Sequence, residues 1–242
     1  MPFEFDFDFG AENGNAVIGR FMPRVSIPIG ERWQLNNLTL AILAFAPGGR
    51  PGFPGNPEPI EGGRVFGLGD WTNGSIFLPP LKSKNFSLGF GPAFGLPVAT
   101  DPRLGSEKWT FGPLLRIGYR PGKWNFNALI INLWSYAGNP HRKDINQLLI
   151  RGLIRHPIND KWYLTSNPII TANWKASRGQ RWLFPLGAGL GRSFQLGKGK
   201  MSVAVHGYFN VIRPDGAPTG LFRIDMLYPL PGSRKSEQAN KK

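Results

Sequence analysis

Hydrophobic and polar residues alternate with a period of two along most of this chain. The clearest example is FEFDFDF (3–9), in which four phenylalanines alternate with Glu4, Asp6 and Asp8. Successive side chains of an extended strand point to opposite faces, so the segment predicts a strand with one aromatic and one acidic face. In a soluble sandwich the acids would face water. In a membrane barrel the phenylalanines would face lipid and the acids a polar lumen.

Twelve segments with this alternation follow one another, and turn residues separate them. Glycine and proline are frequent between the segments, with 32 and 23 residues in the chain, and no stretch has a helical period of capped length. Alternating segments bounded by turn residues predict strands. The predicted strands are 2–10, 15–29, 33–46, 64–79, 86–100, 108–121, 123–137, 145–157, 161–175, 181–196, 201–212 and 220–230.

The lengths of the connections also alternate. Short turns such as GER (30–32) and RPGK (120–123) follow the even-numbered strands, whereas longer loops such as 46–63 and 137–144 follow most odd-numbered strands. Bacterial outer-membrane barrels have this asymmetry and an even number of strands. We therefore expect an all-β fold, namely a closed antiparallel up-and-down transmembrane β-barrel of about 12 strands. Residues 1–231 form its single domain, and residues 232–242 form a basic disordered tail.

Seven of the eight tryptophan residues occur near the ends of the predicted strands, and Trp71 is the exception. Trp124 and Trp134 share one face of a strand, and in a barrel of tilted strands they lie roughly 25 Å apart along the barrel axis, which is the height of a lipid-facing band. A buried core would explain one such residue but not several sorted into two bands. Indole rings favour the level of the lipid headgroups. The predicted membrane-interface residues are Trp33, Trp109, Trp124, Trp134, Trp162, Trp174 and Trp182.

The opposite faces of the strands are polar or small, and we expect them to line the lumen. Seven arginines and five acids have inward parity, and opposite charges on neighbouring strands pair readily. The charged rows form either a salt-bridged wall that only stabilises the barrel or a transverse field that orients solutes. The predicted lumen residues are Glu4, Asp6, Asp8, Arg20, Arg24, Asp70, Arg116, Arg120, Arg151, Arg155, Tyr163, Thr165, Asn167, Arg223 and Asp225.

Composition narrows the function further. The net charge of +14 is spread along the chain instead of forming a patch, and therefore predicts no nucleic-acid partner. The chain has no cysteine, and its three histidines lack the spacing of a metal site. No nucleophile elbow or phosphate-binding loop is present. We therefore expect no catalytic residues, no metal and no cofactor.

Several motifs after residue 64 resemble a known family. FGLGD (66–70), GPAFGLPVATDPRLGSEKWTFGP (91–113), NALIINLWSYAG (127–138), YLTSNPIITANW (163–174) and GYFNVIRPDGAP (207–218) occur in order and with matching spacing. They are similar to the neuromedin U-like outer-membrane proteins, a group that overlaps the meta-pathway phenol degradation family. The resemblance implies a Gram-negative outer-membrane β-barrel that acts as a transporter or channel. It brings no catalytic residues.

Together these observations predict a passive channel for small solutes, either aromatic or anionic, in the bacterial outer membrane. Its partners are a lipid bilayer or detergent and the solutes themselves, and the chain begins MPFEFDF without a signal peptide. The alternative is a non-conducting barrel with a plugged interior, serving as a structural or solute-binding scaffold or as a redesigned protein. The long loop 46–63 is the candidate plug. A third interpretation is a soluble β-sandwich that binds anionic polymers.

Overall fold

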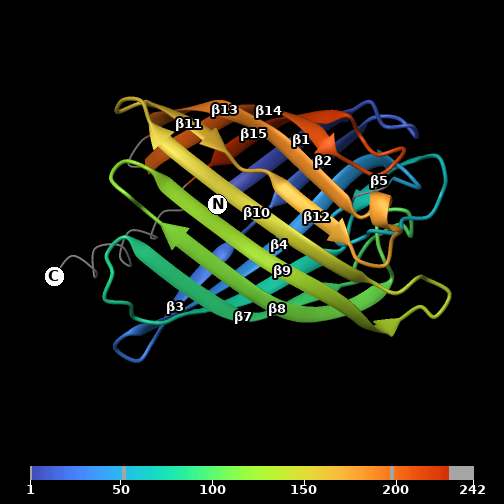
Figure 1. Cartoon of the computed structure of the whole chain (residues 1–242), viewed down its shortest axis with the longest axis horizontal. Coiled ribbons are helices and arrows are strands. Elements are labelled where there is room, and N and C mark those ends of the chain that lie inside the picture. The colour runs from blue at the N-terminus through green and yellow to red at the C-terminus, as the bar shows by residue number, and fades with distance from the viewer. Residues whose placement is uncertain (1, 51–52, 197–198, 229–242) are drawn as a thin grey trace.

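The computed structural model describes residues 2–50, 53–196 and 199–228, and the predicted tail at 232–242 lies outside them. The strands form one antiparallel sheet that closes into a barrel (Figure 1). Its elements are β1 (Pro2–Phe9), β2 (Ala16–Phe21), β3 (Arg24–Ile29), β4 (Trp33–Pro47), β5 (Arg64–Leu68), β6 (Trp71–Leu78), β7 (Phe86–Leu96), β8 (Lys108–Tyr119), β9 (Asn125–Gly138), β10 (Asn146–Pro157), β11 (Trp162–Ser166), β12 (Ile169–Asn173), η1 (Arg178–Gln180), β13 (Trp182–Leu196), β14 (Gly199–Ile212) and β15 (Gly220–Leu227). Among the described residues, no helix has the length and hydropathy to cross a membrane.

Closure comes from the pairing of the first strand with the last. β1 pairs with β15 from Pro2 opposite Leu227 to Phe9 opposite Gly220. The other strands pair with their neighbours in a continuous series, which includes the pairing of β9 with β10. A closed barrel leaves no open sheet edge of the kind that promotes aggregation. The predicted closed antiparallel barrel of 12 strands is confirmed.

Three of the twelve predicted strands are interrupted, which the sequence pattern did not indicate. β2 and β3 are separated at Met22–Pro23, β5 and β6 at Gly69–Asp70, and β11 and β12 at Asn167–Pro168. Proline has no N–H to donate to a strand ladder, so Pro23 and Pro168 break the pairing locally. At Gly69–Asp70 the carboxylate of Asp70 instead accepts hydrogen bonds from the loop that contains Ser106.

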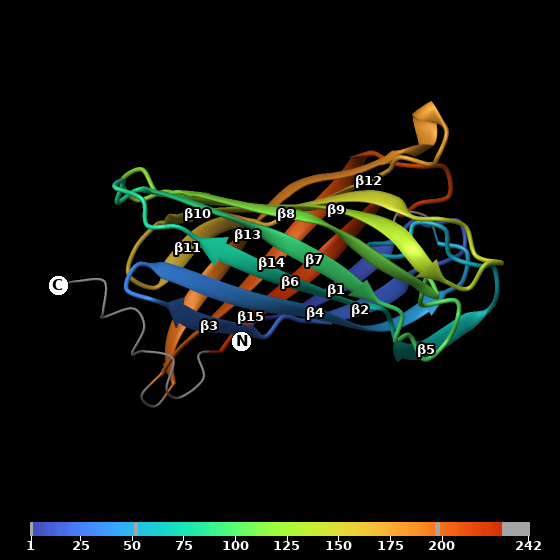
Figure 2. The same cartoon turned by 90° about the horizontal axis from the view of Figure 1, so that it is seen from below.

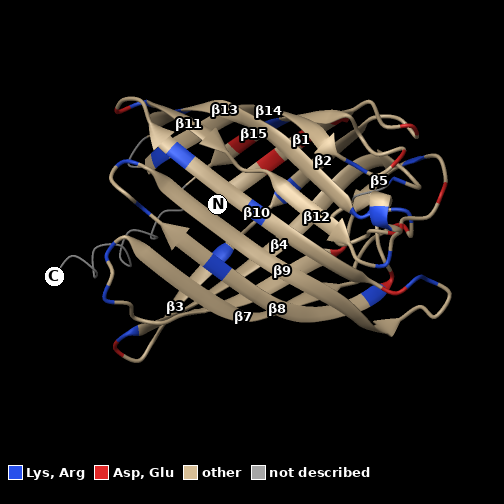
Figure 3. Cartoon of the chain, in the orientation of Figure 1, with Lys and Arg blue, Asp and Glu red and all other residues tan. Residues whose placement is uncertain are grey.

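In most strands one face is more buried than the other, and large hydrophobic side chains are frequent on the exposed face, whereas β3 is exposed along its whole length. In β1, Glu4 and Asp6 are 3% and 1% exposed, whereas Phe5 and Phe7 are 37% and 41% exposed. The outer surface is therefore a broad apolar belt, much larger than the patches that soluble monomers expose. Lysine, arginine and acidic residues gather at the two ends of the barrel, and a smaller number lie within the strands (Figure 3).

The two ends of the barrel differ in the way that the connection lengths predict. The loops after β4, β7 and β12 lie at one end together with β5, and the short turns lie at the other (Figures 1 and 2). We call these the loop end and the turn end. Within the barrel, two apolar clusters form part of the inner wall. One contains Ile76, Leu114 and Leu133, and the other contains Ile18, Ile42 and Phe53.

The predicted interface tryptophans lie on the outer surface. Trp33, Trp109, Trp124, Trp134 and Trp162 are exposed, with exposed fractions from 36% to 44%. Trp174 and Trp182 are half-buried because their rings contact each other edge to face, with ring centroids 5.5 Å apart. The indole N–H of Trp174 donates to Asn132 Oδ1 at 2.8 Å. The arrangement of these residues as lipid-interface girdles stays a prediction.

Candidate functional site in the barrel interior

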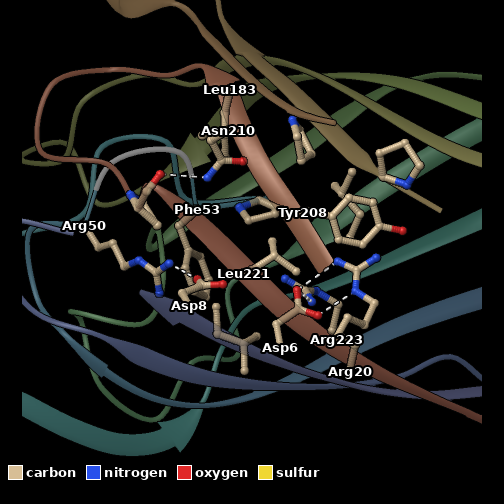
Figure 4. Close-up of a pocket in the computed structure, with 16 residues that line it drawn as sticks. Asp6, Asp8, Arg20, Arg50, Phe53, Leu183, Tyr208, Asn210, Leu221 and Arg223 are labelled. Atoms are coloured by element: carbon tan, nitrogen blue, oxygen red, sulfur yellow. Dashed lines mark hydrogen bonds and ion pairs between the residues drawn. The ribbon is translucent and has the colours of Figure 1, made fainter. Parts of the chain in front are cut away.

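The centre of the lumen is occupied by an ion-paired cluster around Asp6. Strand pairing places Asp6 directly opposite Arg223, and both side chains point inward. Arg223 donates to Asp6 through Nε at 2.6 Å and through Nη2 at 2.8 Å, and Arg20 pairs with the same carboxylate. Figure 4 shows Arg20 and Arg223 beside Asp6. A bidentate arginine–carboxylate contact fixes the geometry of both groups.

The break between β11 and β12 brings Asn167 into this cluster. Arg223 Nη1 donates to the Asn167 carbonyl at 2.7 Å, and Asn167 Nδ2 donates to Asp225 Oδ2 at 2.7 Å. The Tyr208 hydroxyl accepts from the Asn167 backbone N–H at 2.8 Å and donates to Asn167 Oδ1 at 3.0 Å. Asn167 thus links β11 and β12 to β14 and β15 through side chains within the lumen.

One ion pair crosses the lumen. Arg151 on β10 pairs with Glu4 on β1, although these strands lie nearly opposite each other in the order of the barrel. Both side chains are largely buried, with exposed fractions of 19% and 3%. This contact divides the lumen at the level of the cluster, so a solute would have to pass beside it.

The loop between β4 and β5 folds into the loop end of the barrel. Arg50 pairs with Asp8, and Phe53 packs against Ile18 and Ile42 on the inner wall. Figure 4 shows Arg50 and Phe53 reaching toward Asp8. Burial lowers the pKa of Arg50 to about 10, so its guanidinium stays charged at neutral pH.

Further hydrogen bonds join this loop to β10 and to the loop after β7. Gln147 on β10 accepts from the Gly55 N–H at 2.8 Å and donates to the Phe53 carbonyl at 3.3 Å. Asn56 Nδ2 donates to the Gly105 carbonyl at 2.9 Å. The described parts of the loop, residues 48–50 and 53–63, therefore span the mouth from β1 to β10, and we call them the mouth loop.

A second group of predicted lumen residues lies toward the turn end and has no acidic partners among the residues that the structure describes. Arg24 and Arg120 lie near enough to Arg116 to repel its charge. Because β3 and β8 are not neighbours in the sheet, Arg24 and Arg116 interact through the interior. Arg155 lies over the Tyr163 ring at 3.5 Å. Within the described residues, none of these four arginines forms an ion pair with a carboxylate within 4.0 Å.

The structure brings some of the predicted lumen residues together and separates others. Tyr163 and Thr165 face inward and are each 6% exposed. Asp70 lies apart at the loop end, where its carboxylate accepts from the Ser106 N–H at 2.7 Å and Oγ at 2.6 Å. The residues gathered in and around the central cluster are Glu4, Asp6, Asp8, Arg20, Arg151, Asn167, Arg223 and Asp225.

Four residues that contact the lumen cluster or the mouth loop were not predicted from the sequence, namely Arg50, Gln147, His206 and Tyr208. His206 is 1% exposed, and its Nδ1 lies 3.5 Å from Asp225 Oδ2. His206 and Tyr208 have inward parity on β14, so strand alternation would have identified them. Arg50 carries no such signal because it lies in a loop. Within the described residues, no group of three or more histidine or acidic side chains is placed to hold a metal ion.

Two cavities lie on either side of the mouth loop. The inner cavity is bounded by Asp6, Asp8, Phe53, Tyr208 and Leu183, and contains about 530 Å³ of space between atoms, including open solvent at its mouth. The outer cavity contains about 700 Å³ by the same measure and is bounded by Glu58, Gln147, Asn173 and Asp215. Leu183 borders both cavities. The two cavities therefore lie next to each other at Leu183, between the loop end and the central cluster.

No family model and no curated protein matches this chain. Among solved structures, the chain is similar to the COG4313 outer membrane channel from Pseudomonas putida F1, with a TM-score of 0.61 and 13% identity, covering 94% of this chain and 92% of that one. It is also similar to the NanC porin, with a TM-score of 0.55 and 10% identity, covering 94% of this chain and 100% of that one. Over nearly its whole length, the chain therefore has the β-barrel fold of these two outer-membrane proteins.

Proposed function

We propose that this protein is a channel for small solutes in a bacterial outer membrane. The observation that carries the proposal is the apolar outer surface around a lumen that holds buried charged groups, as in the exposed Phe5 and Phe7 against the buried Glu4 and Asp6. Such an arrangement suits a barrel whose outside meets lipid and whose inside meets water. The fold shared with two outer-membrane proteins supports the same proposal.

The solute would enter at the loop end, pass the mouth loop through the outer and inner cavities, and leave past the arginines at the turn end. Arg24, Arg116, Arg120 and Arg155, which form no ion pair with a carboxylate in the described part of the chain, favour anions in the last part of this route. The phenylalanine and tyrosine rings beside the inner cavity suit aromatic solutes equally well. The proposal therefore includes both aromatic and anionic compounds as candidate solutes.

Single-channel recording of the detergent-refolded protein in a planar bilayer tests this function. We expect discrete conductance steps, with a reversal potential under a salt gradient that indicates mild anion preference. Stable insertion without conductance would contradict the channel. Good solubility and a monodisperse state without detergent would contradict the membrane location and favour a soluble β protein.

A second candidate function is a plugged barrel that binds a solute without conducting it. This alternative is favoured by the ion pair between Arg151 and Glu4 across the lumen and by the attachment of the mouth loop at both Asp8 and Gln147. Barrels of twelve strands lie between packed eight-stranded barrels and open sixteen-stranded porins. Conductance separates the two functions directly.

The finer family assignment is also part of the proposal. The motifs FGLGD (66–70) and GYFNVIRPDGAP (207–218) resemble the neuromedin U-like outer-membrane proteins. In the structure the first motif ends at the break between β5 and β6, and the second covers the end of β14 and the loop that follows. An alignment of related chains that retains these motifs at the same strand positions would support the assignment.

A further inference from the structure

The wall of the inner cavity holds buried polar atoms that lack partners. Asp8 Oδ1, Asn210 Oδ1, Arg20 Nε and Arg50 Nη1 form no hydrogen bond with any described residue. Their four side chains border the cavity and are between 3% and 7% exposed. A buried polar group without a partner costs free energy, so each of these atoms favours a molecule that satisfies it.

The unpaired atoms comprise both donors and acceptors. Arg20 Nε and Arg50 Nη1 offer N–H groups, whereas Asp8 Oδ1 and Asn210 Oδ1 accept. The Asn210 assignment follows from its Nδ2, which donates to the Pro218 carbonyl at 2.7 Å. A hydroxyl group donates one hydrogen bond and accepts others, and therefore matches this mixed set.

The charges around the cavity already balance. Arg20, Arg50, Arg151 and Arg223 compensate Glu4, Asp6, Asp8 and Asp225 within the network of the central cluster and mouth loop. A charged solute would add a buried charge without a partner, which is costly. An uncharged solute avoids this cost.

Apart from Asp6, Arg223 and Tyr208, the remaining wall is apolar. Phe53, Ile18, Leu221 and the rings of Pro54, Pro168 and Pro185 border the same cavity. A ligand pocket with a mainly apolar wall and a few placed polar groups is the usual form of a small-molecule site.

We infer that the inner cavity is a binding site for a small uncharged molecule with an apolar ring or chain and at least one hydroxyl group. The proposed channel supplies the route by which such a molecule reaches the cavity. The inference adds the chemical class of the solute and places its binding between Asp8, Asn210 and the apolar wall.

Calorimetric titration of the full chain in detergent tests the inference, with empty micelles as the blank. The probes share one six-membered ring: cyclohexanol, cyclohexanecarboxylate and cyclohexylammonium. We expect saturable binding of cyclohexanol at one site, and binding of either ion weaker by about tenfold or more. Tighter binding of the carboxylate would overturn the inference in favour of an anion site, and absence of saturable binding for all three probes would overturn it outright.

A matched pair of variants locates the binding. Leu221→Trp fills the inner cavity, whereas Leu190→Trp places the same ring on the outer face, where Leu190 is 45% exposed. We expect cyclohexanol binding to weaken by about tenfold or more in the first variant and to stay unchanged in the second. Equal binding in both folded variants would assign the signal to the outer surface and overturn the inference. The probe series on the unchanged chain remains decisive if Leu221→Trp does not fold.

Conductance of the same preparation separates this inference from the proposed channel. Binding of cyclohexanol without conductance would keep the site and reject the channel. Conductance without saturable binding would keep the channel and reject the site.

Discussion

Arg151 and Glu4 form an ion pair across the lumen, from β10 to β1. Strands β1 and β10 are not neighbours in the sheet, so the contact is made by side chains alone. It lies beside the cluster in which Arg223 and Arg20 pair with Asp6. This ion pair links β10 to β1 and narrows the lumen between them.

Replacing one partner of this pair leaves the other as a buried charge. We expect Arg151→Gln to lower the free energy of unfolding by about 3–5 kcal/mol, because breaking a buried pair from one side is strongly destabilising. The double variant Glu4→Gln with Arg151→Gln should recover a large part of that loss. Denaturant titration of the refolded barrel measures both values. Additive losses in the double variant would show that the two side chains do not interact.

Removing the ion pair that holds the mouth loop at Asp8 should widen the opening at the loop end. In Arg50→Ser the loop loses its ion pair with Asp8 but keeps the hydrogen bonds to Gln147. We expect a larger single-channel conductance, or frequent transitions to a larger level, in planar bilayers. Lys82→Ser is the control, because Lys82 is exposed in the turn between β6 and β7, at the end of the barrel away from the mouth loop. An unchanged conductance in Arg50→Ser would mean that the mouth loop does not limit the current.

The arginines at the turn end should set the charge selectivity. Arg116→Gln together with Arg120→Gln removes two positive charges that lie near Arg24 and have no acidic partner among the described residues. We expect the reversal potential under a salt gradient to move toward cation preference. Lys161→Gln, in the turn between β10 and β11, removes a charge that is exposed outside the strands. If this control shifts the potential as much as the double variant, the selectivity arises from net charge alone.

The outer face should resist charged substitutions. Ile130 lies in the middle of β9 with outward parity, between Phe126 and Trp134. We expect Ile130→Arg to lower the free energy of unfolding in lipid vesicles by about 2–4 kcal/mol, which is the cost of arginine near the midplane of a bilayer. His141→Arg, in the exposed loop after β9, should cost little. A negligible cost at Ile130 would show that this face does not meet lipid.

The sequence alone was enough to predict the twelve-stranded barrel and the faces of strands such as β1, although not the three breaks within strands. Alternation with a period of two is a local property, and it gives the same faces whatever the neighbours of a strand are. The alternation therefore assigns Phe5 and Phe7 to one face of β1 and Glu4 and Asp6 to the other, whichever strands lie beside β1. The alternating lengths of the connections likewise separated the loop end from the turn end, because consecutive antiparallel strands must reverse direction.

Only the tertiary structure decided which inward side chains meet. The alternation along each strand predicts that Glu4 and Arg151 face inward. It does not predict that they meet, because that contact depends on the circumference and closure of the barrel. The same holds for Asp70, which has inward parity but interacts with Ser106 because the strand breaks at Gly69–Asp70. The inward path of the mouth loop depends on Asp8 and Gln147, which lie on strands far away in sequence. The interior is thus set by long-range contacts of side chains, whereas the wall follows from local alternation.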